Sequence, residues 1–400
     1  MSEAQSLSRR KVTALWCLMG VIMLLILEAS AFALIWVANG SGREPILRRQ
    51  ALFDQQSQLL SRIIDGASRD QFHETLGWQY RPGFAGNMDT VNAMGLRAAR
   101  EYSEARPEGA LPRVAAFGDS FVYCSEVSND ACWSSILESG WSTEVLNYGV
   151  GGYGTDQALL RYREEGERLS PDVVLIGFAP INLRRAVNRY RRFISAHEGP
   201  WFKPRFLLVD DELRLLPPPV GSIETARALR DNPAMVTSFG EDDHWYQPAV
   251  YEHLLHDWSA AYRVATRIKS VLDRRYFDEE RLYEADGGFR TESPAFPLQV
   301  RLLEQFRSEV AERGARPIVL YLPSGEDVAL ARTGAPVTYA PLKEALEALG
   351  AESLDPIDDL ADATGEVLFA PGGHYSRRGN TVLAEVIARH LAYEARIDPR

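Results

Sequence analysis

The 400-residue chain has only three cysteines, Cys17, Cys124 and Cys132, and none of them belongs to a Cys-x-x-Cys pair. So few cysteines cannot form a disulfide framework or a zinc ribbon, because both need closely spaced groups of cysteines. Basic residues are also in the minority: 44 lysines and arginines face 55 aspartates and glutamates, which gives a formal charge of -11. A surface of this charge repels phosphate backbones, so nucleic acid is not an expected partner.

Several catalytic motifs are missing from the sequence as well. It contains no Gly-x-Ser-x-Gly elbow, no P-loop and no His-Glu-x-x-His helix. The run Gly149-x-Gly151-x-x-Gly154 does match the dinucleotide fingerprint. However, the acid that should bind the ribose belongs near the end of the next strand, and Asp172 precedes that strand. We therefore expect neither a cofactor nor a metal.

The overall composition is that of a globular protein with a substantial core. Hydrophobic residues make up 46% and charged residues 25% of the chain, which excludes wholesale disorder and collagen-like repeats. At 400 residues the chain can hold two or three domains, or one large α/β domain with insertions. No internal repeat or low-complexity block is evident.

An apolar run from Val12 to Ala38 follows the basic residues Arg9, Arg10 and Lys11. The run exceeds the roughly 20 residues that a bilayer-spanning helix needs and is longer than the core of a cleavable signal peptide. We therefore predict a cytoplasmic tail over 1–11 and an uncleaved single-pass anchor over 12–38, in a bacterial inner membrane. Glu28 interrupts the run and either marks a helix partner or is tolerated in a single span.

With the tail inside, residues 39–400 lie outside the cytoplasm, where thiols can oxidise. A disulfide between Cys124 and Cys132 then becomes one interpretation, because the two enclose a short loop with turn-forming residues. Two separately buried thiols are the alternative, since the sequence does not give their Cα separation.

The rest of the chain predicts an α/β fold. Residues 39–70 have apolar residues near helical spacing and are expected to form a helical stalk that leads into a domain over 71–400. In that domain short apolar strands alternate with helical patterns, which is typical of a parallel sheet covered on both faces. The predicted strands are Val114–Phe117, Val145–Tyr148, Asp172–Phe178 and Pro317–Leu322.

The alternation stops between about 185 and 300, which we interpret as an insertion in the α/β core. A hairpin is predicted from Lys203 to Leu216, with Asp210 and Asp211 at its turn. A basic cluster stands at the start of the insertion. It either binds an anionic glycan or lipid headgroup or forms a solvated helix face, and it comprises Arg184, Arg185, Arg189, Arg191 and Arg192.

Chemistry-bearing residues follow the predicted strands. Gly118-Asp119-Ser120 comes directly after the first strand, and a serine at such a corner is exposed at the carboxyl edge of a parallel sheet. Asn147 lies at the end of the second strand, Gly152 comes after it, and Asn182 follows the third strand. His374 stands before the C-terminal helix. A serine hydroxyl needs a base to take its proton, and an imidazole titrating near neutrality suits that role.

These four blocks, in this order, resemble the SGNH/GDSL hydrolase superfamily over roughly 110–182 and 317–395. Gly77-Trp78 and Asn92-x-x-Gly95-x-Arg97 are similar to the run-in of its membrane-anchored bacterial members. The resemblance implies a flavodoxin-like α/β/α sandwich as the fold. It implies cleavage or transfer of acyl esters as the activity. It also implies that Ser120 is the nucleophile and His374 the base, with an oxyanion hole formed by Ser120, Gly152 and Asn182.

The sequence departs from this family where the acid of the triad is expected. Three residues before the histidine the chain has Pro371 in place of the acid. A carboxylate from the preceding segment (Asp355, Asp358 or Asp359) is one substitute, and a backbone carbonyl that holds the ring is another. A smaller departure is Leu183, where many relatives have aspartate.

The sequence thus predicts a membrane-anchored, extracytoplasmic serine esterase. Its expected partners are an ester-bearing small molecule, glycan or lipid, with an O-acetyl group as one candidate ester, and the membrane through the N-terminal helix. One alternative is an O-acyltransferase that passes the acyl group to an envelope glycan. Another is a non-catalytic scaffold that keeps the fold, for which Pro371 is the main support.

Overall fold

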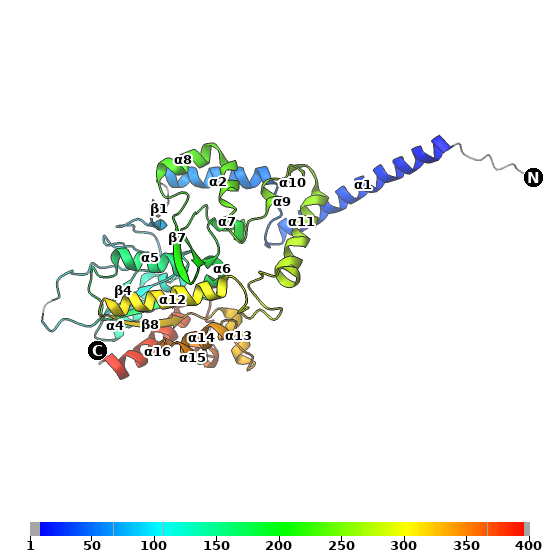
Figure 1. Cartoon of the computed structure of the whole chain (residues 1–400). Coiled ribbons are helices and arrows are strands. Elements are labelled where there is room, and N and C mark those ends of the chain that lie inside the picture. The colour runs from blue at the N-terminus through cyan, green and yellow to red at the C-terminus, as the bar shows by residue number, and fades with distance from the viewer. Residues whose placement is uncertain (1–8, 67, 107, 366, 396–400) are drawn as a thin grey trace, which may run out of the picture.

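The computed structural model describes residues 9–395, except 67, 107 and 366. A parallel five-stranded sheet forms the centre of the molecule, and its strands lie in the order β4-β3-β5-β8-β9 (Figure 1). Counted along the chain, this is the order second, first, third, fourth, fifth, which is that of flavodoxin-like sheets. The predicted α/β class with a parallel sheet is therefore confirmed. The strands of this sheet are β3 (Arg113–Phe117), β4 (Glu144–Asn147), β5 (Val173–Phe178), β8 (Arg316–Tyr321) and β9 (Ser353–Leu354).

Two small antiparallel hairpins and a set of helices complete the fold. The hairpins pair β1 (Asp70–His73) with β2 (Gly77–Tyr80) and β6 (Arg205–Val209) with β7 (Glu212–Leu216). The helices are α1 (Arg9–Gly40), α2 (Arg49–Ile64), α3 (Ser120–Tyr123), α4 (Trp133–Gly140), α5 (Thr155–Glu165), α6 (Asn182–Ala186), α7 (Arg191–Ile194), α8 (Ile223–Asp231), α9 (Pro248–Tyr251), α10 (Leu255–Trp258), α11 (Ala260–Leu272), α12 (Ala295–Glu312), α13 (Gly325–Arg332), α14 (Ala340–Ala348), α15 (Ile357–Asp362) and α16 (Arg377–Ala395). Shorter helical turns are η1 (Asn129–Ala131), η2 (Pro233–Phe239) and η3 (Asp273–Phe277).

Both faces of the central sheet are covered, because successive side chains of a strand point to opposite faces. In β3, Val114 and Ala116 pack with α4, α15 and α16, whereas Ala115 and Phe117 pack with α5, α12 and α14. Figure 1 shows α12 on one side of β8 and α16 on the other. The four predicted core strands agree with β3, β4, β5 and β8 to within one residue at each end. Strand β9 was not predicted, since two residues give no periodicity.

The stretch expected as an insertion lies between β5 and β8 and contains the hairpin β6–β7. Asp210 and Asp211 form its turn with left-handed φ angles of 50° and 64°, which aspartate tolerates better than most residues. A buried ion pair connects this stretch to the core. In it, Lys203 Nζ donates to the Asp156 carboxylate at the start of α5. Both side chains are fully buried. Removing one partner of such a pair costs about 3–5 kcal/mol.

Helix α2 forms where a stalk was expected, but it is not a free spacer. Its residues Leu52, Phe53 and Leu60 are buried in the main hydrophobic core, and the helix lies along α8 (Figure 1). The spacing of these apolar residues gives the helix one apolar stripe, and a stripe of this kind is stable only when another element covers it.

Helix α1 covers the predicted anchor and extends it by a few residues at each end. It is long and apolar enough to cross a membrane, a description that a signal sequence near an N-terminus would also meet. In Figure 1 its N-terminal part projects away from the rest of the chain, and its C-terminal part packs against α11.

Candidate active site

Ser120 is the first residue of α3, directly beyond the carboxyl end of β3. The side chain of Asp119 accepts a hydrogen bond from the Phe121 N–H at 2.9 Å and thereby caps this short helix. Ser120 is 8% exposed. The first strand therefore delivers a serine hydroxyl to the edge of a parallel sheet, where such folds place their sites.

The imidazole of His374 lies against this serine. Its Nε2 is 2.8 Å from Ser120 Oγ, and its ring packs 5.1 Å from the ring of Phe121. A tight turn holds the histidine, because the Ala370 N–H donates to the His374 carbonyl at 2.7 Å. The structure thus brings together the nucleophile and the base that the sequence predicted, at hydrogen-bond distance.

Glu126 supplies the carboxylate on the other side of the imidazole. Its Oε2 is 2.6 Å from His374 Nδ1, and the carboxylate also accepts from the N–H groups of Gly372 at 2.7 Å and His374 at 3.1 Å. Burial raises the pKa of the Glu126 carboxyl, but the hydrogen bonds from His374 and Gly372 outweigh this and hold the pKa below its ordinary value. Ser120, His374 and Glu126 are therefore connected as a Ser-His-Glu triad would be.

Glycine is required at position 372 for this contact. A Cβ atom there would lie 2.4 Å from the Glu126 Oε1. Glu126 itself has a left-handed φ of 71°, a conformation that costs a residue with a side chain about 1–3 kcal/mol and that recurs at functional sites.

The three aspartates that the sequence suggested for this role lie elsewhere, so that prediction was wrong. Asp355 accepts hydrogen bonds from Tyr339 and Lys343, Asp359 pairs with Arg389, and Asp358 is exposed on α15. The family pattern has its acid just before the histidine, whereas the carboxylate that contacts His374 comes from the loop that follows Ser120. One signal did exist, since Glu126 stands between the two cysteines, six residues after Ser120.

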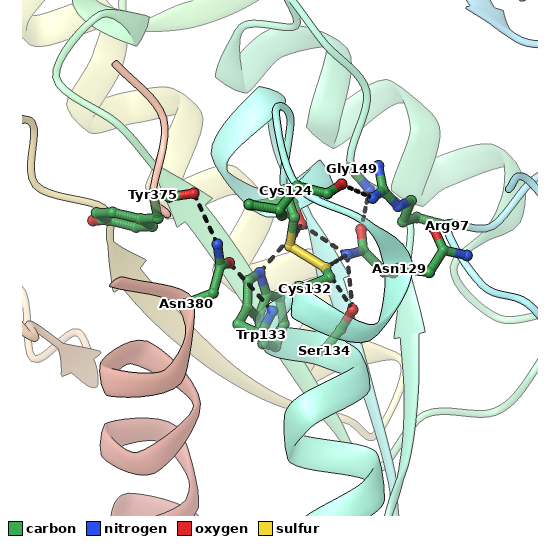
Figure 2. The surroundings of a disulfide bond; sticks show 12 residues. Arg97, Cys124, Asn129, Cys132, Trp133, Ser134, Gly149, Tyr375 and Asn380 are labelled. Atoms are coloured by element: carbon green, nitrogen blue, oxygen red, sulfur yellow. Dashed lines mark hydrogen bonds between the residues drawn. A yellow bond between two sulfur atoms is a disulfide. The ribbon is translucent and has the colours of Figure 1, made fainter. Parts of the chain in front are cut away.

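A disulfide closes the loop that carries Glu126. Cys124 and Cys132 are bonded, with their Cα atoms 5.4 Å apart (Figure 2). From the run-in segment, Arg97 donates to the carbonyl of Val127 in this loop at 2.7 Å. Asn380 of α16 accepts from the Trp133 N–H and donates to the Tyr375 carbonyl, so it links the end of the loop to the neighbour of His374 (Figure 2).

The disulfide is expected to matter for catalysis because it constrains Glu126. Replacing both cysteines (Cys124→Ser with Cys132→Ser) should lower kcat for ester hydrolysis about 100-fold, the cost of misplacing a catalytic group by ~1 Å. A reductant should have the same effect on the unaltered protein. The matched control is Cys17→Ser, which removes the free cysteine. Full activity in the double variant would show that Arg97 and the backbone N–H groups hold Glu126 without the disulfide.

Asn182 carries an unused donor at the same edge of the sheet as Ser120. It begins α6 beyond β5, and its Nδ2 is buried without a hydrogen-bond partner among the described residues. Its Oδ1 accepts from Arg185 at 3.3 Å, which leaves the amide N–H groups free for a ligand. A buried, unpaired donor is costly unless a substrate satisfies it, and an oxyanion would do so.

Gly152 adopts a left-handed φ of 83°, in the loop that follows β4. The β1–β2 hairpin clamps this loop, since the Tyr80 hydroxyl accepts from the Gly151 N–H at 2.8 Å and Trp78 Nε1 donates to the Gly151 carbonyl at 3.2 Å. The run-in thus fixes the backbone around Gly152. This function was not evident from the sequence, because it depends on a contact between segments that are about 70 residues apart.

Arg185 connects the loops that follow β3, β4 and β5. Its Nη1 donates to Asp119 at 2.9 Å, to the Tyr153 carbonyl at 2.9 Å and to Asn182 at 3.3 Å. Burial and the nearby Arg191 charge lower the pKa of Arg185 to about 10, against the opposing effect of Asp119. This arginine therefore positions the site from inside the protein.

The other members of the basic cluster also have partners within the chain. Arg189 pairs with Asp242, Arg191 pairs with Glu198, and Arg192 donates to Gln55. Arg184 packs on the ring of Trp245, with its guanidinium carbon 5.2 Å from the ring centroid. The cluster is therefore not a solvated helix face.

A cavity of about 360 Å³ lies beyond the ends of β5 and β8. The insertion contributes part of its wall. Its lining residues are Pro180, Ile181, Arg184, Tyr283, Gly287, Phe289, Ser324, Glu326 and Thr338.

No family model and no curated protein matches the chain. Among solved structures, it is similar to the lipase/acylhydrolase from Enterococcus faecalis at 15% identity and a TM-score of 0.33, over 72% of this chain and 99% of that one. It is also similar to an acetylxylan esterase from Geobacillus stearothermophilus at 13% identity and a TM-score of 0.33, over 71% and 95% of the two chains. Similarity of this degree assigns no activity to the chain.

Proposed function

We propose that the chain is a serine-dependent esterase that cleaves an acyl ester through an acyl-enzyme. One observation carries the proposal: Ser120 Oγ, the His374 imidazole and the Glu126 carboxylate are joined by contacts of 2.8 Å and 2.6 Å. A serine, a base and a group that orients the base, within hydrogen-bond reach of one another, are the requirements for nucleophilic catalysis of acyl transfer.

The geometry suggests the following steps. Ser120 Oγ attacks the ester carbonyl carbon while its proton passes to His374 Nε2. Glu126, held ionised by its hydrogen bonds, stabilises the imidazolium that forms. The negative charge on the carbonyl oxygen is met by the N–H groups of Ser120 and Gly152 and by Asn182 Nδ2. His374 then protonates the departing alcohol, and a water molecule activated by His374 releases the acyl group.

The proposal includes a place for this reaction. We infer that α1 anchors the protein in a membrane and that the remainder lies on the oxidising side, which the disulfide between Cys124 and Cys132 supports. The proposed substrates are ester-bearing small molecules, glycans or lipids at that membrane face.

A covalent probe tests the proposal directly. A fluorophosphonate should label the full-length protein in detergent once, at Ser120, and the labelled protein should no longer hydrolyse p-nitrophenyl acetate. The Ser120→Ala variant should remain unlabelled, while Ser125→Ala, which removes a neighbouring serine outside the triad, should be labelled as the unaltered protein is. Absence of labelling in folded protein would favour the non-catalytic scaffold.

A further inference from the structure

Glu28, the acid within the apolar helix α1, has partners at the start of another helix. Its carboxylate accepts hydrogen bonds from the Ser259 hydroxyl and from the N–H groups of Ala260 at 2.7 Å and Ala261 at 3.3 Å. These groups form the N-terminus of α11, where unpaired N–H groups and the helix dipole favour an anion. Of the two interpretations of Glu28, the structure favours a helix partner, and that partner is α11.

This contact fixes the height of α11 along α1. If α1 spans a membrane with its apolar run from Val12 to Ala38, Glu28 lies in the half of that run nearer the globular domain. The start of α11 is therefore expected in the leaflet on that side.

The apolar stripe of α11 is only half covered. At its N-terminal end, Ala260, Ala261 and Val264 pack against Ala31 and Ile35 of α1. The same stripe continues along α11, but there its side chains are exposed: Ile268, Val271 and Leu272. The C-terminal half of the stripe, beyond its contact with α1, therefore has no protein partner among the described residues.

Flanking residues extend this exposed apolar surface in both directions. Trp258, directly before the Ser259 that contacts Glu28, is 84% exposed, and Leu254 and Leu255 are exposed beside it. After α11, Tyr276 and Phe277 are exposed, the latter at 70%. Monomeric soluble proteins rarely expose apolar side chains in such a contiguous group.

Two basic side chains of the segment can meet an anionic lipid surface. Residues 254–277 contain five lysines and arginines against two aspartates, and Asp278, Glu279 and Glu280 follow directly. Arg263 is buried, Lys269 pairs with Asp273 and Arg274 packs on Trp245, whereas Arg267 and Arg275 are at least partly exposed. A basic amphipathic helix with exposed tryptophan and leucine is typical of segments that lie in a membrane interface.

We propose that residues 254–277 lie in the membrane interface, with Trp258, Ile268, Leu272 and Phe277 among the acyl chains. Lipid is thus the partner of the exposed stripe, and Glu28 fixes the start of the segment in the leaflet nearer the globular domain. This inference rests on the proposed anchoring by α1.

The segment also contacts, through Trp245, a residue of α6 that lines the cavity beyond β5. Trp245 packs between Arg274, next to α11, and Arg184, two residues after Asn182, with its ring centroid 5.3 Å and 5.2 Å from the two guanidinium carbons. The cavity that Arg184 lines therefore stands a few side chains from this segment.

Site-directed spin labels in the full chain, reconstituted in vesicles of phosphatidylcholine and anionic phosphatidylglycerol, test the proposal. Labels at Leu272→Cys and Phe277→Cys are made in a Cys17→Ser background. Their collision rates with oxygen, which concentrates in lipid, and with a water-soluble nickel chelate are compared. The control is Leu349→Cys, at an exposed leucine just after α14. The ratio of oxygen to nickel collisions should be several-fold higher at 272 and 277 than at 349.

Native Cys17, labelled in the unaltered chain, reports on α1 separately. If position 17 is in lipid while 272 and 277 behave like 349, the interfacial segment is disproved and the anchor stands. If position 17 is in water, the anchoring fails and this inference fails with it. If 272 and 277 are shielded from both reagents, a second copy or another protein covers the stripe, which also overturns the proposal.

Discussion

Ser120→Ala is expected to lower kcat for p-nitrophenyl acetate about 10⁶-fold, since loss of the nucleophile removes the acyl-enzyme route altogether. A residual rate of about 10³–10⁴ over the uncatalysed reaction should remain, because the proposed oxyanion donors, Asn182 among them, stay in place. Steady-state kinetics of the purified full-length protein in detergent measure both values. The decrease in kcat/KM should come from kcat with little change in KM, because Ser120 Oγ stabilises the transition state more than the bound ester.

His374→Ala should have nearly the same effect, and combining it with Ser120→Ala should add almost nothing. The two groups act as one unit across their 2.8 Å contact, so either loss disables the other group. A double variant that is far slower than each single variant would mean that Ser120 and His374 act in separate steps. Activity retained in Ser120→Ala would remove this serine from the mechanism.

Glu126→Gln is the second large expected effect, a decrease of about 10⁴-fold in kcat. Glutamine keeps the size of the side chain, but it removes the charge that stabilises the imidazolium. Its amide N–H groups would also face a ring nitrogen that donates in the active tautomer. Because the pKa of Glu126 lies below its ordinary value, the carboxylate is ionised at neutral pH, and its contribution is lost only as the pH falls through that lowered pKa. The full difference should therefore be present at neutral pH.

Asp358→Asn is the matched control for this variant. Asp358 was one of the sequence-based candidates for the acid, and it is exposed on α15 away from the imidazole. Its kcat should equal that of the unaltered protein. If instead Asp358→Asn is slow and Glu126→Gln is not, the contact between Glu126 and His374 is not used in catalysis.

Much of the fold could be predicted from local patterns. Runs such as Val114–Phe117 are wholly buried strands, and a run of this kind followed by a polar corner is visible in the sequence itself. The positions of Ser120 and Asn182 followed from that pattern, because parallel strands end at one edge of the sheet. The Ser120 hydroxyl and the Asn182 amide could therefore be placed at this edge without knowledge of distant contacts.

The acid could not be found in this way, because its place depends on tertiary structure. Glu126 reaches His374 through a left-handed backbone, a loop closed by a disulfide, and Gly372, which leaves room for its carboxylate. None of these features has a periodicity. The same reason applies to the β1–β2 hairpin, whose contacts with Gly151 join distant segments, and to α2, where an apolar stripe indicated a helix but not the surface that covers it.

The position of Glu126 inside the loop from Cys124 to Cys132 also bears on when the proposed esterase would become active after synthesis. A newly made chain whose thiols are still reduced carries Ser120 and His374 but lacks the closed loop that holds their acid. Maturation of the triad would then depend on the cell's thiol-oxidising machinery and follow export. Cytoplasmic esters would be spared while the protein is being synthesised.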